Sequence, residues 1–134
     1  MNSMRYLIEC ELATTDTTTN GFVVGTGDYP TSPHAGSAFS LNQYPATYPM
    51  YFQTTSGGSY RRIMPTLTND LTMQRYSIRK DATGVYVTNV TKSVTQGAGA
   101  FDTGGDTFTR VGATSANTGA LNGWVKNIRI SQLP

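Results

Sequence analysis

Apolar and polar residues alternate with a period of two over much of this chain. In residues 4–13 every second position from Met4 to Leu12 is apolar or cysteine, and most of the positions between them are polar or charged. Residues 74–80 (QRYSIRK) alternate in the same way. Because successive side chains of a β-strand point to opposite faces, both segments are predicted to be strands with one buried face.

Other short segments combine β-branched or aromatic residues with glycine, proline, asparagine or aspartate at their ends, which is typical of strands. They are residues 21–25, 37–42, 50–53, 60–64, 85–87, 108–112 and 121–130. Turns are predicted at 56–58 and 81–84, and residues 44–49 are predicted to be a proline-bounded connector. No window carries a long 3.6-residue apolar period, so the chain is predicted to be all-β.

The last predicted strand contains a break in its alternation. Val125 cannot share a face with Ile128 and Ile130 at a strict period of two. A β-bulge near Lys126-Asn127 would turn all three apolar side chains inward. We therefore expect a bulge at this point.

Composition indicates one globular domain over residues 1–134. Of the 134 residues 37% are hydrophobic and only 13% are charged, which favours a folded core over disorder. The net charge is +2, and basic residues are scattered apart from Arg61-Arg62 and Arg79-Lys80. We therefore expect no nucleic-acid partner. No apolar run approaches the length of a membrane span, and no leader pattern opens the chain, so neither membrane insertion nor a signal peptide is expected.

Cys10 is the single cysteine. An intramolecular disulfide and a cysteine-based zinc site are therefore excluded. Because Cys10 shares its alternation phase with apolar residues, we expect a buried and inert thiol.

The order of these segments resembles a known fold family, the concanavalin A-like, laminin G-like jelly roll. The matching segments are MRYLIECELATTD, GFVVGTGD, SAFSLN, the hairpin RYSIRKDATGVYV, and the ending TRVGA...LNGWVKNIRIS. The resemblance implies an all-β sandwich of two antiparallel sheets, with ten or more short strands. Two features depart from the family pattern: a Trp-His pair before Gln74 is missing, and residues 88–91 replace an Asp-Gly hairpin tip. These motifs identify a fold better than a function.

The resemblance also carries a functional expectation. Similar endings are frequent in phage tail, fibre and capsid-surface proteins, and the fold mostly binds partners or builds surfaces. It implies a non-enzymatic virion structural or surface protein of a phage, made in the host cytoplasm and bound to other virion proteins, with host surface glycan as a further partner. The alternative is a carbohydrate-binding module or adhesin. A homo-oligomer is compatible with both, because an open sandwich leaves sheet edges to protect.

Two acidic motifs bear on the question of catalysis. Glu9 and Glu11 lie on one face of a predicted strand, as the carboxylates of a glycosidase of this fold do. The family's catalytic strand carries three acids in alternation, however, and Ala13 occupies the third place. Asp102-Thr103-Gly104 matches the triplet of aspartic proteases but lies in a glycine-rich segment, where a chance match is favoured. No enzymatic activity is expected.

Candidate binding residues are aromatic or acidic. Trp124 has the opposite parity to Val125, and Tyr29, Tyr44 and Tyr48 are predicted to lie in loops. Exposed aromatic rings can stack on sugars, whereas the alternative role is packing under a loop or in a subunit interface.

The candidate metal site also has two interpretations. Asp102 and Asp106 are candidate calcium ligands, because calcium takes hard oxygen donors, and the alternative is a flexible loop. No other cofactor is expected. His34, the single histidine, is predicted to be exposed, and Asn89-Val90-Thr91 is a glycosylation sequon that has meaning only in a eukaryotic secretory setting.

Overall fold

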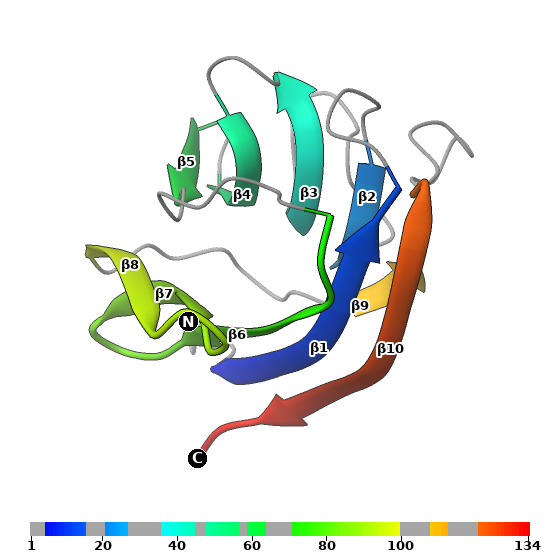
Figure 1. The fold of residues 1–134 in the computed structure, drawn as a ribbon. Helices are drawn as coiled ribbons and strands as arrows, with labels where there is room; N and C mark the ends of the chain where they lie inside the picture. Colours follow the sequence, from blue (N-terminus) through cyan, green and yellow to red (C-terminus); the bar gives the residue numbers. More distant parts are fainter. Residues whose placement is uncertain are drawn as a thin grey trace.

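The chain folds into two antiparallel β-sheets packed face to face (Figure 1). The computed structural model describes residues 5–15, 21–26, 36–44, 48–56, 59–63, 71–99, 108–112 and 121–134. The first sheet has the order β10-β1-β6-β7-β8 and the second has the order β5-β4-β3-β2-β9. Strands of the first sheet are β1 (Tyr6–Thr14), β6 (Gln74–Lys80), β7 (Gly84–Asn89), β8 (Val94–Gly99) and β10 (Gly123–Gln132). Strands of the second sheet are β2 (Gly21–Thr26), β3 (Gly36–Tyr44), β4 (Tyr48–Ser56), β5 (Ser59–Ile63) and β9 (Phe108–Val111).

The first and last strands of the chain lie side by side. β1 pairs antiparallel with β10 on one side and with β6 on the other (Figure 1). Backbone bonds close the pair at both ends: the Leu133 amide donates to the Arg5 carbonyl at 2.9 Å, and the Thr15 amide donates to the Asn122 carbonyl at 2.8 Å. The fold is therefore closed by contacts between residues far apart in the sequence.

Alternation along the first sheet builds one wall of the core. The inward side chains of β1, β6 and β7 are buried, and they meet two buried valines of β2 from the second sheet. Burial of apolar area of this kind stabilises a sandwich by about 25 cal/mol per Å². The core consists of Tyr6, Ile8, Cys10, Leu12, Val23, Val24, Tyr76, Ile78, Val85 and Val87.

Strand predictions agree with the structure where alternation is strict. β6 spans the predicted residues, and the predicted turn between β6 and β7 is formed by residues 81–83. The Asp81 side chain organises this turn, because its Oδ1 accepts hydrogen bonds from the Thr83 amide at 2.7 Å, the Thr83 hydroxyl at 2.6 Å and the Gly84 amide at 3.2 Å. The β-bulge of β10 also lies at the predicted position, since the register with β1 shifts between Glu9 and Glu11.

The bulge turns all three apolar residues to the inner face, as predicted, but it leaves Ile130 exposed. Val125 and Ile128 pack against the core as expected. Ile130 pairs with the buried Ile8, yet its side chain is 42% exposed. β10 is the outermost described strand of its sheet, so a side chain on it has a neighbour among the described strands on one side only.

The predicted connector at residues 44–49 is shorter than expected. Tyr44 ends β3, Tyr48 begins β4, and the two residues are Cα partners across the hairpin. The prediction that both tyrosines lie in loops is therefore wrong. Pro49 is tolerated inside β4 because β5 pairs only with residues 52–56 of that strand, so no ladder bond on that side requires its missing N–H.

A polar cluster is buried beside the core near the start of β6. The Asn89 side-chain amide donates to Gln74 Oε1, and the Tyr76 hydroxyl donates to the same oxygen at 3.4 Å. The Lys92 backbone amide donates to Asn89 Oδ1 at 2.9 Å, which fixes the connection to β8. Asn89 is therefore a structural residue in the folded chain, because its sequon amide is buried and hydrogen-bonded.

Candidate functional site

The outward side chains of the first sheet form a polar surface. On β1 the outward positions include Glu9 and Glu11, which alternate with the buried Ile8, Cys10 and Leu12. Glu9 pairs across the sheet with Arg129 on one side and Ser77 on the other, and the next row contains Lys126, Glu11 and Arg75. The outer face is defined as this surface of β10, β1 and β6, together with Trp124.

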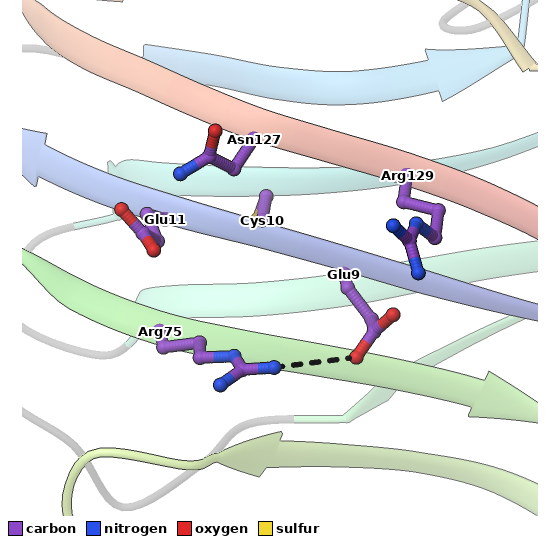
Figure 2. A pocket seen from close by; sticks show the side chains of 6 residues that line it. All are labelled: Glu9, Cys10, Glu11, Arg75, Asn127 and Arg129. Atoms are coloured by element: carbon purple, nitrogen blue, oxygen red, sulfur yellow. Dashed lines mark ion pairs between the residues drawn. The ribbon is translucent and has the colours of Figure 1, made fainter.

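A shallow depression lies on the outer face over the bulge. Its volume is about 280 Å³, and it is open to solvent on one side. Figure 2 shows that side chains from three strands surround it, and that the Arg129 side chain extends from β10 toward β1. The lining residues are Glu9, Cys10, Glu11, Arg75, Asn127 and Arg129.

The bulge brings these side chains together. Two residues of β10, Asn127 and Ile128, oppose the single residue Cys10 of β1. Asn127 has φ 54°, a left-handed conformation that asparagine adopts more readily than most residues. Because the extra residue resets the alternation, Ile128 packs against the core while Asn127 and Arg129 stay exposed.

Ion pairs on the outer face link neighbouring strands. Arg75 Nη2 lies 3.7 Å from Glu9 Oε1, and Lys126 Nζ lies 3.4 Å from Glu11 Oε2 (the first pair is drawn in Figure 2). Both pairs are partly exposed, so each contributes about 0–1 kcal/mol to stability. Arg129 forms no ion pair with any residue that the structure describes, and its guanidinium can donate hydrogen bonds to a ligand.

Trp124 lies beside this depression. It is 61% exposed, and its partner across the ladder is Ala13. It stands two residues before Lys126 on β10, whose partner is Glu11, so the indole and the charged rows occupy one surface. The parity of the sequence placed Trp124 off the core, and its exposure confirms this position.

The other aromatic and acidic candidates do not belong to the described part of this surface. Tyr44 and Tyr48 pair in the second sheet, and their side chains lie outside the described part of the chain. Tyr29, Asp102 and Asp106 also lie outside the described residues, as does His34. Within the described ranges, no three His, Cys, Asp or Glu side chains are grouped closely enough to hold a metal ion. The same ranges contain no helix long and apolar enough to cross a membrane.

Cys10 borders the depression but faces the core. Burial raises the pKa of its thiol to about 12, and the nearby Glu11 carboxylate adds to this shift. A thiol with such a pKa is protonated at neutral pH and is a poor nucleophile. Its role is packing, as the sequence predicted.

Sequence reasoning missed Arg75, Lys126, Asn127 and Arg129 as site residues. They come from β6 and β10, which are linked only through β1, so their proximity depends on the strand order. The one sequence signal near them was the phase break that predicted the bulge. The predicted bulge was therefore the only sequence signal that pointed to the site residues of β10 missed in this way, Lys126, Asn127 and Arg129.

Comparisons with known proteins identify the fold. No protein-family model and no curated protein matches the sequence. Among solved structures, domains LG4-5 of the mouse laminin alpha1 chain superpose with a TM-score of 0.71 over 98% of this chain, at 15% sequence identity. The match covers 36% of the laminin structure, so this chain spans about a third of its length. The sequence-based fold prediction is confirmed: the chain has the concanavalin A-like jelly-roll fold of laminin G domains.

Proposed function

We propose that this chain is a non-catalytic recognition module that binds its partner through the outer face. The observation that carries the proposal is the exposed Trp124 beside a polar depression lined by five charged or amide side chains. Aromatic residues and arginine are enriched in protein interfaces, whereas a solvated sheet face carries a large exposed indole less often. The laminin G fold is compatible with this role, although a fold alone does not define one.

At finer detail, we propose a structural or surface protein of a phage virion, attached to other virion proteins as a capsid decoration, fibre or tail component. The ending LNGWVKNIRIS, which resembles endings in such proteins, supports this placement. The same ending forms β10, so it supplies Trp124, Asn127 and Arg129 to the outer face. The residues behind the resemblance are thus also the residues of the proposed surface.

The carboxylates of the outer face favour binding over hydrolysis. A retaining or inverting glycosidase needs one carboxyl group that holds a proton in a sheltered site. The Glu9 and Glu11 side chains are each 31% exposed, and each lies within 4 Å of a cationic group. Glu9 and Glu11 are therefore assigned to the binding surface and its ion pairs.

The second candidate function is carbohydrate binding as an adhesin or lectin-like module. The exposed indole of Trp124 favours it, because an aromatic face can cover the apolar side of a sugar ring. Neighbouring carboxylate, guanidinium and amide groups offer donors and acceptors for hydroxyl groups. On this alternative the site is the same and the partner is a glycan.

The virion proposal is tested on purified particles of the phage that encodes the chain. Antibodies against this protein should detect it in the particles by immunoblot and label the particle surface in gold electron microscopy. Particles of an unrelated phage are the control. Particles that contain none of the protein would contradict the virion assignment, while leaving the recognition module to be judged by glycan binding.

The carbohydrate alternative is tested on a broad glycan array, with calcium and again with a chelator. Selective binding that Trp124→Ala abolishes would favour the adhesin. Loss of binding under the chelator would indicate a metal-dependent site. No binding to any glycan, either with calcium or with the chelator, would favour the structural role.

A further inference from the structure

Four strands end the two sheets in the described part of the chain, and they differ in charge. β10 carries Lys126 and Arg129, β5 carries Arg61 and Arg62, and β9 carries Arg110. β8 (VTQGAG) is the only one of the four without a charged residue. Charged residues on an outer strand discourage pairing with another chain, and by sequence three of these described edge strands carry such residues while β8 carries none.

The edge of β8 is also the more regular of the two in its sheet. All six of its residues pair in unbroken register with β7, from Asn89–Val94 to Gly84–Gly99. β10, in contrast, is interrupted by the bulge at Asn127. A bulge twists a strand and disturbs the spacing of its backbone groups, whereas a straight strand leaves a regular row of them for a new partner.

The outward residues of β8 that the structure describes are small. The outward residues Thr95 and Gly97 alternate with the half-buried Val94 and Gln96. The Tyr86 ring lies against Gly97, since a Cβ at Gly97 would be 2.5 Å from Tyr86 Cδ1. The Thr95 and Thr88 hydroxyl oxygens lie 2.9 Å apart, so the Thr95 side chain is turned toward β7. Of the described side chains, a strand that approaches the edge therefore meets few atoms.

We propose that β8 is a self-association edge, at which a second copy of this chain pairs its own β8 antiparallel to the first. Charge favours a second copy as the occupant. In such a symmetric pair each strand meets itself, so any charge on it faces the same charge, and β8 has none. The first sheets of the two copies then form one continuous sheet, which is the mode of strand addition known from peptide recognition.

The geometry restricts the register of this pair. Paired residues of an antiparallel sheet point to the same face, and the outward face must stay outward in both copies. The two-fold axis must therefore pass beside a residue and not between two residues, and an axis beside Gln96 or Gly97 pairs the largest part of β8. β5 ends the described second sheet and contacts β8 on this side, and its sequence contains two arginines, a composition that disfavours pairing of a strand with its own copy. We expect one sheet to continue across the dimer and the other to stop.

Sedimentation of the full chain from low micromolar to millimolar concentration tests the proposal. The wild type should show a reversible monomer–dimer equilibrium. Thr95→Lys places the two lysines on one face of the joined sheet, two positions apart along the strands when the axis passes beside Gln96 and four positions apart when it passes beside Gly97. Because it also adds a charge to an edge that has none, we expect it to raise the dimer dissociation constant by about tenfold or more. Ser131→Lys adds the same charge on β10 at the opposite edge and should leave the constant unchanged. Circular dichroism checks that both variants fold.

Hydrogen exchange gives a second readout that needs no variant. Backbone amides of β8 should gain protection as the wild-type concentration rises, while amides of β10 should not. A wild type that stays monomeric at millimolar concentration overturns the proposal, as does a dimer that Thr95→Lys leaves unchanged. Protection of β8 at every concentration in a monomer would mean that this chain's own residues cover the edge, and it would also overturn the proposal.

Discussion

Asn127 lies beside Cys10 at the one place where the ladder between β10 and β1 skips a residue. On strict alternation from Val125, the side chains of Asn127 and Arg129 would point into the core. The extra residue instead returns Ile128 to the core and leaves the two polar side chains on the outer face. The bulge thus keeps the apolar residues of β10 on the core side and also creates the depression.

The left-handed conformation of Asn127 predicts an asymmetric response to substitution. Asn127→Gly should leave the free energy of unfolding within about 0.5 kcal/mol, because glycine adopts φ 54° without strain. Asn127→Val should lower it by about 1–2 kcal/mol, because a β-branched residue is strained there. Urea unfolding measures both variants. Equal stabilities of the two would show that the bulge does not constrain this residue.

The turn at Asp81 predicts a pH dependence of stability. Hydrogen bonds from Thr83 are the main cause of the lowered pKa of Asp81 from its ordinary value of 3.8, and the Arg79 guanidinium 3.0 Å away adds to the shift. A carboxyl whose folded-state pKa is depressed stabilises the fold above the unfolded-state pKa, and this contribution is lost as pH falls through the folded-state value. Wild type should therefore lose stability in this acid range.

Asp81→Asn is the matched variant for this test. It keeps an oxygen that can accept from the Thr83 amide, but it removes the charge. We expect it to be less stable than the wild type at neutral pH, with the difference shrinking as pH falls below about 4. The urea midpoints of both proteins across the acid range measure this. A difference that is constant with pH would contradict the assigned role of the charge.

The contact between Gly97 and the Tyr86 ring predicts a steric penalty. Gly97→Ala would place a Cβ 2.5 Å from Cδ1 and 2.8 Å from Cε1 of that ring. The ring cannot move away freely, because the Tyr86 hydroxyl lies 3.0 Å from Thr83 Oγ1 in the turn. We expect a loss of about 1–3 kcal/mol in the free energy of unfolding.

A double-mutant cycle separates this clash from a general intolerance of alanine. In a Tyr86→Ala background Gly97→Ala should cost much less. Gly112→Ala is the control, since no atom of the described residues lies within 4 Å of its added Cβ and its φ of 80° is itself a source of strain. Its cost should be the same with and without Tyr86. Additive costs for Gly97 and Tyr86 would contradict the contact.

Much of the fold could be predicted from the sequence because one-sided burial leaves a clear signal. β6 was predicted residue for residue, since its alternation is strict and Asp81 and Gly84 supply the turn after it. β8 was missed because Gly97 and Gly99 are typical of loops. In the structure Gly97 gives room to the Tyr86 ring, a requirement set by the neighbouring strand and invisible in a local pattern.

The candidate site was predicted only in part, for a similar reason. The parity of Trp124 relative to Val125 placed it on the outer face, because parity is a local property. The approach of Arg75 and Arg129 to Glu9 depends on pairing between β1 and two strands more than sixty residues later in the chain. No local pattern specifies such pairing, so the family resemblance was the only guide to it.

The raised pKa of Cys10 predicts a thiol that reacts only when the chain opens. Burial and the Glu11 carboxylate hold the pKa at about 12, so the reactive thiolate is scarce at neutral pH. We expect alkylating reagents to label the folded protein slowly, at a rate that rises with added urea in step with unfolding. Rapid labelling of the folded protein would show that the region around Cys10 opens locally.

The central claim is that the outer face of the first sheet recognises a partner through Trp124. The most direct test measures binding of the wild type, Trp124→Ala and the control Val111→Ala to two probes, purified phage particles and a broad glycan array. Both variants remove an exposed apolar side chain, Trp124 being 61% and Val111 56% exposed, so both should keep their stability within about 1 kcal/mol. We predict that the wild type and Val111→Ala bind at least one probe, and that Trp124→Ala loses that binding while remaining folded. Undiminished binding by Trp124→Ala, or no binding of the wild type to either probe, would contradict the claim.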